Sequence, residues 1–279
     1  AVDDRLVSTI GSRTPSISAN VYLLIYDAYA PAETMWAYGI DNSAQEAFLV
    51  ESGFVLYPAV YSVGPSTLDT MNTVFNLSVT DDEYGKRIVS GDGMVHHAFK
   101  YAGYQTAGIF PNDYMFRGIG SSYDYSIPER SVPPYVYMIS SILMGEFRFN
   151  LWFEKYSQDE YLKIKEDALL EVAEKRSFVY SHSNYPSHSQ NSGACLPDET
   201  NLYQERLARA NIEMRQDVQT ISEHDPQAII IIAGDHGPYL TKNCVTLAEE
   251  FDQSEIDRLD IQDRYGTFLA IRWPDEDYV

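Results

Sequence analysis

The stretch Ala228-Ile229-Ile230-Ile231-Ile232-Ala233-Gly234-Asp235-His236-Gly237 decides the fold. Four consecutive isoleucines after Asp225-Pro226 predict a strand that is buried on both faces, as in the centre of a parallel sheet. In open α/β sheets, ligands bind just beyond the carboxyl ends of the strands, and Asp235 and His236 follow this strand directly. An adjacent carboxylate and imidazole can bind a divalent cation together. A strand end with a capping Asp and an incidental His would give the same pattern.

A second apolar run, Ser18 to Tyr26, predicts another buried strand, and it too ends at an aspartate, Asp27. Further alternation of strand and helix patterns follows along the chain. We expect helices over 45–52, 95–102, 137–146, 150–156 and 202–223, and strands over 54–57, 103–110, 177–180 and 265–274. The Pro- and Tyr-rich run 111–137 reads as a surface excursion, with a lid as one interpretation.

This order of elements predicts an α/β fold with a doubly wound, mostly parallel sheet flanked by helices. No interior linker or repeat divides the chain. We therefore expect a single domain over residues 1–279, with a loose lead-in over 1–17.

The formal net charge of −21 argues against nucleic acid as a partner, because phosphate contacts need clustered Lys and Arg. No run of about 18 apolar residues is present, so nothing in the sequence is expected to span a membrane. The first residues do not have the pattern of a signal peptide, and the chain does not begin with Met. We therefore expect a mature fragment or an expressed domain. Cys195 and Cys244 allow one disulfide, whose formation the sequence leaves open.

A hydroxyl opens one predicted helix. The turn Gly64-Pro65 precedes Ser66 and Thr67, and apolar residues then recur at helical spacing. Either hydroxyl could simply cap the helix, the commonest use of Ser or Thr at this position. Alternatively, it is a nucleophile whose developing anion and phosphoryl group lie in the positive field of the helix N-terminus.

Besides His236 and His224, the chain has four histidines. His182 and His188 lie in a Ser- and Pro-rich loop straight after the strand 177–180, where they could ligate a metal, contact an anionic substrate, or be exposed loop residues. His96 and His97 are adjacent on a helix and diverge by about 100°, so we interpret them as structural or surface residues. Carboxylates together with imidazoles suit zinc or manganese.

The order of these features resembles the alkaline phosphatase/sulfatase superfamily: a strand ending in Asp27, a hydroxyl at a helix start, a His loop, and Gly234-Asp235-His236-Gly237. The resemblance runs from about Asn20 to Trp273. It includes Tyr101-Ala102-Gly103-Tyr104-Gln105-Thr106, which is similar to the family's aGYxT strand entry. Within the superfamily, the chain looks closest to the membrane-anchored phosphoethanolamine and phosphoglycerol transferases.

This resemblance implies a phospho-threonine mechanism in a metal-dependent enzyme. Thr67, one residue inside the helix start, would be the nucleophile, and Ser66 its neighbour on the substrate side. The family's metal, zinc or manganese, would be held by four residues: Asp27, Thr67, Asp235 and His236. Pro186-Ser187-His188 is similar to the family's sHgP loop, so His188, and with it His182, would bind substrate phosphate or a second metal.

Two departures narrow what the resemblance implies. The Cys-x-Pro-x-Arg motif from which formylglycine sulfatases make their nucleophile is absent, which argues against sulfate hydrolysis by that route. Pro238 follows Gly237 where the lipid A phosphoethanolamine transferases usually carry an acidic residue, and no His follows His236. Pro238 and the lack of a later His argue against a full second metal site and against lipid A specificity.

The function expected from the resemblance is transfer of a phosphoethanolamine- or phosphoglycerol-type headgroup from a lipid donor to a glycan or lipid acceptor, through phospho-Thr67. A phosphodiesterase, phosphatase or sulfatase-type hydrolase on the same fold is the alternative, and a non-catalytic carbohydrate- or lipid-binding module is a second one. We expect an extracytoplasmic domain, periplasmic or at the cell surface, joined to the membrane by segments outside this chain.

Overall fold

The computed structural model describes residues 19–78, 85–117, 119–129, 139, 142–143, 156–189, 198–240, 254 and 256–274. Its helices and strands are, in chain order, β1 (Val21–Tyr26), α2 (Ala32–Ala37), α3 (Ser43–Glu51), β2 (Phe54–Leu56), β3 (Val60–Tyr61), α4 (Thr67–Asn76), the π-helix η1 (Ile88–Asp92), α5 (Met94–Tyr101), β4 (Gln105–Ile109), β5 (Tyr125–Ile127), α7 (Gln158–Ala173), β6 (Ser177–Ser183), α8 (Glu199–His224), β7 (Ile229–Gly234), α9 (Arg258–Tyr265), β8 (Gly266–Thr267) and β9 (Leu269–Arg272).

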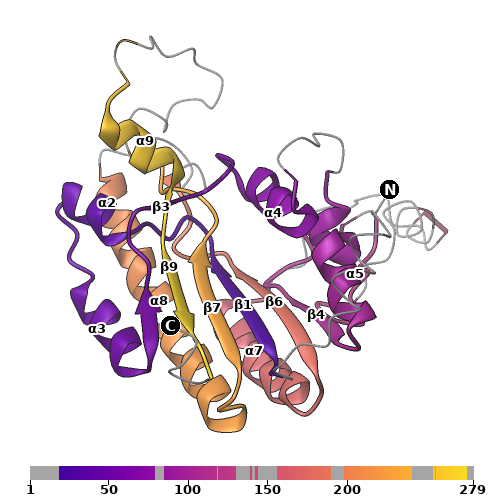
Figure 1. Cartoon of the computed structure of the whole chain (residues 1–279). Helices are drawn as coiled ribbons and strands as arrows, with labels where there is room; N and C mark the ends of the chain where they lie inside the picture. Colours follow the sequence, from indigo (N-terminus) through magenta and orange to yellow (C-terminus); the bar gives the residue numbers. More distant parts are fainter. Residues whose placement is uncertain are drawn as a thin grey trace. The chain divides into compact units, whose positions relative to one another are not determined.

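The fold is α/β, with a mixed sheet of seven strands flanked by helices, which confirms the predicted class (Figure 1). The chain divides into two compact units. The larger contains Ala19–Thr70 and the chain from His182 onward, and carries the strands in the order β2-β9-β7-β1. The smaller runs from Met71 to Ser181 and carries most of β6 together with β4 and β5. The single-domain organisation stays a prediction.

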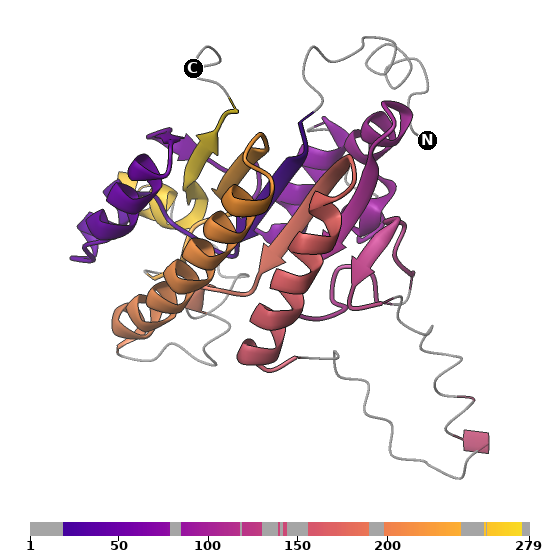
Figure 2. The same cartoon turned by 90° about the horizontal axis from the view of Figure 1, so that it is seen from below.

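The larger unit is built on the parallel pair of β1 and β7. Their register places Tyr26 opposite Gly234, so both strands end at the same edge of the sheet. Helix α8 runs along β1, β7 and β9, as Figures 1 and 2 show, and the Tyr26 hydroxyl donates to Asp217 on this helix at 2.6 Å. This packing fixes the strand end from which Asp27 follows.

The isoleucines of β7 alternate in burial. Ile230 and Ile232 are fully buried, whereas Ile229 and Ile231 keep partial exposure. Successive side chains of a strand point to opposite faces of the sheet, so one face of β7 is covered more completely than the other. The strand itself is where the sequence placed it, and of the two faces that were expected to be buried, one is fully buried and the other is covered in part.

The smaller unit has helices on both faces of its strands. Phe178 of β6 stacks on Phe99 of α5, with ring centroids 4.2 Å apart. The adjacent Ser177 donates through its hydroxyl to the Val172 carbonyl of α7 at 3.0 Å. Because neighbouring residues of a strand face opposite sides, α5 and α7 cover opposite faces, as in a doubly wound sheet.

Several predicted boundaries need correction. Strand β6 continues through Ser183, so His182 lies within the strand and not in the loop after it. The predicted last strand over 265–274 is divided into the end of α9, β8 and β9. Strand β5 lies in the predicted surface excursion and was not anticipated. Cys195, Cys244 and most of 130–155 lie outside the described residues. Across the described ranges, we find no helix that is both long and apolar enough to cross a membrane.

Candidate active site

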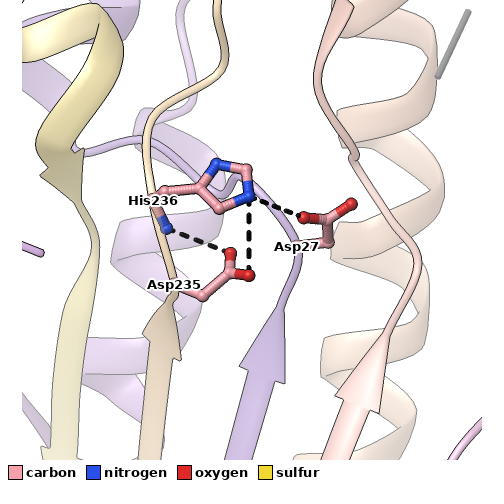
Figure 3. Close-up of side chains that lie close together, drawn as sticks. All are labelled: Asp27, Asp235 and His236. Carbon is pink, nitrogen blue, oxygen red and sulfur yellow. Dashed lines mark hydrogen bonds and ion pairs between the residues drawn. The ribbon is translucent and has the colours of Figure 1, made fainter. Parts of the chain in front are cut away.

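Two strand ends bring three potential metal ligands together. Asp27 follows β1, and Asp235 and His236 follow β7, so the parallel register of these strands makes the three side chains neighbours (Figure 3). One ligand atom from each lies within 4.8 Å of the others, and all three residues are buried. The prediction that these residues meet at one sheet edge agrees with this arrangement.

One nitrogen of the His236 ring faces both carboxylates, as Figure 3 shows. Its Nε2 is 3.2 Å from Asp27 Oδ1 and 3.6 Å from Asp235 Oδ2. Its Nδ1 is 2.9 Å from the carbonyl oxygen of Gly237. A carbonyl can only accept a hydrogen bond, so Nδ1 carries a hydrogen and the lone pair of the neutral ring belongs to Nε2. This is the tautomer that a metal ligand at Nε2 requires.

Asp27 and His236 shift the pKa values of each other. Burial works to lower the pKa of His236, but the charge of Asp235 and the hydrogen bond and charge of Asp27 outweigh it and raise that pKa to about 9. Burial works to raise the pKa of Asp27, but the hydrogen bond and charge of His236, with the charges of His188 and His182, hold it below its usual value. Without a metal, His236 is therefore protonated at neutral pH, and its single positive charge offsets part of the charge of the carboxylates.

Asp235 is held by donors on both of its oxygens. The backbone N–H groups of Ala28 and His236 donate to Oδ1, at 2.9 and 3.0 Å. The hydroxyl of Thr67, the first residue of α4, donates to Oδ2 at 2.6 Å. This contact joins residues that are 168 positions apart in the sequence, and it places a hydroxyl at a helix start directly on the carboxylate cluster.

Ser66 has a different environment from its neighbour. Its hydroxyl donates to Asp69 Oδ2 at 2.7 Å, and the Asp69 backbone N–H lies 3.4 Å from the same hydroxyl oxygen. This is the geometry of a residue that caps the start of α4. Of the two hydroxyls that the sequence left open, Thr67 contacts the cluster and Ser66 contacts its own helix.

His182 and His188 approach the cluster from β6 and the loop after it. His182 is buried, with its Nε2 3.7 Å from Asp235 Oδ2. The His188 ring centroid is 5.3 Å from that of His236, and its Nδ1 is buried without a hydrogen-bond partner among the described residues. Burial, with the charge of His236, lowers the pKa of His188. A neutral His188 can serve as a hydrogen-bonding group toward a phosphoryl oxygen.

The loop that carries His188 is tied to the strand ends. The Ser187 N–H donates to the Asp27 carbonyl at 2.8 Å, and the Ser189 hydroxyl donates to the Tyr239 carbonyl at 2.6 Å. Among the described residues, five non-glycine residues have a positive φ, and three of them, Ala28, Ser187 and Tyr239, lie in the segments next to the cluster. Such strained conformations concentrate at functional sites in proteins.

Three further residues support the site, and the sequence reasoning missed them. The Tyr239 ring stacks on His236 at 5.1 Å and lies 5.0 Å from the His188 ring. The Tyr203 hydroxyl of α8 donates to the Ala28 carbonyl at 2.9 Å, which fixes the turn after Asp27. Arg206, also on α8, donates to the Pro186 carbonyl at 2.8 Å. Only Tyr239 had a sequence signal, since it stands two residues after Gly237.

The side chains of the cluster fit a divalent metal ion. Asp27 Oδ1 is buried and faces His236 Nε2 at 3.2 Å, and the hydrogen bond of His236 Nδ1 to the Gly237 carbonyl reserves Nε2 for a ligand. Two carboxylates and an imidazole are a donor set that zinc accepts. The arrangement is that of an α/β protein in which the hydroxyl of the first residue of a helix lies against a cluster of carboxylates and imidazole at the ends of two parallel strands.

No protein-family model and no curated protein matches this chain. Solved structures do. They include the zinc complex of the C-terminal periplasmic domain of EcEptC from Escherichia coli, which is 13% identical, with a TM-score of 0.58 over 93% of this chain and 74% of that one. The soluble domain of lipooligosaccharide phosphoethanolamine transferase A from Neisseria meningitidis is 14% identical, with a TM-score of 0.56 over 93% and 78%. The lipoteichoic acid synthase LtaP from Listeria monocytogenes is 12% identical, with a TM-score of 0.54 over 98% and 72%.

These similarities show the fold of the chain. The motif order predicted a resemblance to the alkaline phosphatase/sulfatase superfamily, and the fold that this resemblance implied is the fold that the chain shares with phosphoethanolamine transferase domains and LtaP. The sequence identities of 12 to 14% are too low to carry residue roles from those proteins to this one.

Proposed function

We propose that this chain is a metal-dependent transferase. It would move a phosphoethanolamine- or phosphoglycerol-type headgroup from a lipid donor to a glycan or lipid acceptor, through a covalent phospho-Thr67 intermediate. The observation that carries the proposal is the Thr67 hydroxyl, 2.6 Å from Asp235 Oδ2 within the cluster of Asp27, Asp235 and His236. A hydroxyl at a helix N-terminus and beside such a cluster has the surroundings of an activated nucleophile.

In the first half of the reaction, Thr67 Oγ1 attacks the phosphorus of the donor. The Oγ1–P bond forms, the bond from phosphorus to the lipid oxygen breaks, and the Thr67 proton passes by way of Asp235 to the released lipid hydroxyl. In the second half, an acceptor hydroxyl attacks the same phosphorus, the bond from phosphorus to the acceptor oxygen forms as the Oγ1–P bond breaks, and the acceptor's proton passes to Thr67 Oγ1. A divalent metal ion, held by Asp27, Thr67, Asp235 and His236, would lower the pKa of the hydroxyl and offset the phosphoryl charge.

His188 and His182 would act on the substrate side of this site. The buried Nδ1 of His188 lacks a hydrogen-bond partner among the described residues, so a phosphoryl oxygen would satisfy it. Ser66 is committed to Asp69 and the start of α4, and we assign it no direct part in the proposed chemistry.

The names of the solved proteins support the proposed class of substrates. Those proteins are described as a phosphoethanolamine transferase acting on lipooligosaccharide and as a lipoteichoic acid synthase. Both names refer to lipid- and glycan-containing molecules. By the same analogy we propose an extracytoplasmic location, because the EcEptC neighbour is a periplasmic domain, with attachment to a membrane through segments outside this chain.

The test is release of p-nitrophenol from a phosphate monoester, a phosphodiester and a sulfate ester, with zinc or manganese supplied. We expect cleavage of the phosphodiester and a loss of about 10³-fold or more in Thr67→Ala, because removing a nucleophile disables the whole catalytic unit. Ser66→Ala is the matched control, and it should keep activity within several-fold. Cleavage that survives in Thr67→Ala would overturn the nucleophile assignment.

A hydrolase on the same fold differs only in the group that resolves phospho-Thr67. If adding glycan or lipid acceptors diverts product from the water-derived one, the chain is a transferase; if not, it is a phosphodiesterase or phosphatase. If the chain cleaves none of the three esters, it is incubated with lipid donors. The mass of the intact protein then shows whether Thr67 becomes modified. A chain that also fails to take up zinc or manganese would instead be a binding module.

A further inference from the structure

Arg206 reaches from α8 to the loop that carries His188. Its Nε donates to the Pro186 carbonyl at 2.8 Å, two residues before His188. The side chain is mostly buried, at 17% exposure. One arginine nitrogen is therefore engaged with the backbone of the His188 loop, and the remaining question is what the other donors of the guanidinium bind.

The terminal nitrogens of Arg206 make no hydrogen bond to a described residue. Nη2 is buried without a partner, and Glu199 Oε2, at 4.0 Å, is within range of an ion pair but too far for a hydrogen bond. Arg carries five N–H donors in a fixed fork, and leaving a buried donor unmet is costly. An acceptor brought by a ligand would remove this cost.

The charge of Arg206 acts within the site. It contributes to the lowered pKa of His188, behind burial and the charge of His236. In turn, burial lowers the pKa of Arg206 itself, while the carboxylates of Glu199 and Asp27 oppose that effect. Arg206 is therefore an electrostatic neighbour of Asp27 and His188, and its guanidinium stays protonated at any working pH.

The proposed reaction needs a positive group here. The chain carries a net charge of −21, and Asp27 and Asp235 together cancel the charge of a divalent ion. A phosphodiester is itself an anion. Without a further cation, the substrate would be brought to a site with no net attraction for it, and arginine matches phosphoryl oxygens better than any other side chain.

We propose that Arg206 binds a non-bridging phosphoryl oxygen of the substrate with a terminal nitrogen, while its Nε holds the backbone of the His188 loop. This inference rests on the proposed function, because it assigns Arg206 as a substrate-binding residue of the same site. It selects donors that present an anionic phosphoryl group to Arg206, His188 and the Thr67 hydroxyl.

The experiment measures binding of phenylphosphonate, a phosphoryl anion with no ester bond to cleave, to the zinc-loaded protein by calorimetry. Arg206→Gln keeps a donor for the Pro186 carbonyl but removes the charge, whereas Arg206→Lys keeps the charge. We expect binding about 10- to 100-fold weaker in Arg206→Gln, the size of one charge-assisted hydrogen bond, and a smaller loss in Arg206→Lys.

Arg209→Gln is the matched control. Arg209 lies one turn further along α8 and approaches the Tyr185 side chain of the same loop, but it is exposed. The Arg209→Gln variant should bind the phosphonate with the same affinity as the native chain. Equal binding by Arg206→Gln and the native chain would overturn the proposal, as would a greater loss in Arg206→Lys than in Arg206→Gln, which indicates a purely structural role.

Because the measurement is of binding, it separates this proposal from the proposed function. Phosphonate binding that depends on Arg206 in a chain without transfer activity supports the anion site and counts against the transferase. A native chain that turns over diesters but binds the phosphonate independently of Arg206 supports the enzyme and removes Arg206 from its substrate site.

Discussion

His236 is the residue whose protonation decides what the cluster can hold. Its pKa is raised to about 9 because the charge of Asp235 and the hydrogen bond of Asp27 outweigh burial. A group with a raised folded-state pKa stabilises the fold fully below its unfolded value of about 6.5, and this contribution is lost as the pH rises through about 9. A metal needs the same ring in its neutral form, so binding must displace a proton.

We therefore expect zinc affinity to rise about tenfold per pH unit below about pH 9, with one proton released for each ion bound at neutral pH. Calorimetry at one pH, in two buffers of different ionisation enthalpy, measures this proton directly. His224→Gln is the control, because His224 is an exposed histidine at the end of α8 and should leave the released proton unchanged. Zinc binding that is independent of pH would contradict the assignment of His236 as a ligand.

At the same scale, the sequence correctly predicted the positions of those candidate site residues that directly follow a strand end. Asp27, Asp235 and His236 were predicted to meet because parallel strands end at one edge, and the structure brings them together. His182 was placed wrongly in a loop. Nothing in Ser181-His182-Ser183 favours a strand by propensity, and the strand state of these residues depends on neighbours that a local pattern cannot show.

At the scale of elements, the packing of the turn after β7 explains why a glycine stands on each side of the Asp235-His236 pair. A Cβ on Gly234 would lie 2.3 Å from the Tyr29 carbonyl oxygen, and one on Gly237 would lie 2.1 Å from the Asp263 carbonyl oxygen of α9. At these distances the neighbouring backbone would have to shift to make room for the Cβ, which costs stability. The close approach of α9 thus holds the segment that carries Asp235 and His236 at the end of the sheet.

Gly237→Ala should therefore lower the free energy of unfolding by about 1–3 kcal/mol, as overpacking does, and should also weaken zinc binding by moving His236. Urea unfolding and zinc titration measure the two effects. Gly53→Ala is the control: its φ is +85° and nothing lies within 4 Å of its Cβ, so it should cost stability through backbone strain alone and leave zinc affinity unchanged. Equal zinc affinity in both variants would mean that α9 does not position the cluster.

The longer elements were predictable because their patterns repeat over many residues. Helix α8 has the apolar periodicity of an amphipathic helix, and α4 begins at the hydroxyl expected from Gly64-Pro65. Strand β5, only Tyr125–Ile127, has no such repeat, and it exists through its pairing with β4. The contacts of Tyr203 and Arg206 with the site also depend on residues that are distant in the sequence. The sequence of α8 shows only which face of the helix is apolar, so it could not predict these contacts.

On the scale of the whole molecule, the fold of the larger unit concentrates negative charge at one point. Asp27 and Asp235 are both buried in a chain whose net charge is already −21. They follow strands that lie about 200 residues apart in the sequence. An ion that binds both carboxylates exists only with the folded chain, so it links strand ends that the unfolded chain does not bring together.

We accordingly expect zinc to raise the melting temperature of the chelator-treated chain by several degrees. A ligand that binds only the folded state adds about 2.7 kcal/mol at a free concentration 100 times its dissociation constant. Asp27→Asn should abolish the shift, because it removes one carboxylate of the cluster. Asp41→Asn is the control, since Asp41 is an exposed carboxylate whose backbone contact is with Ser43, and it should show the full shift. A zinc-induced shift that persists in Asp27→Asn would mean that the ion stabilises the chain from another site, and the assignment of Asp27 as a ligand would fall.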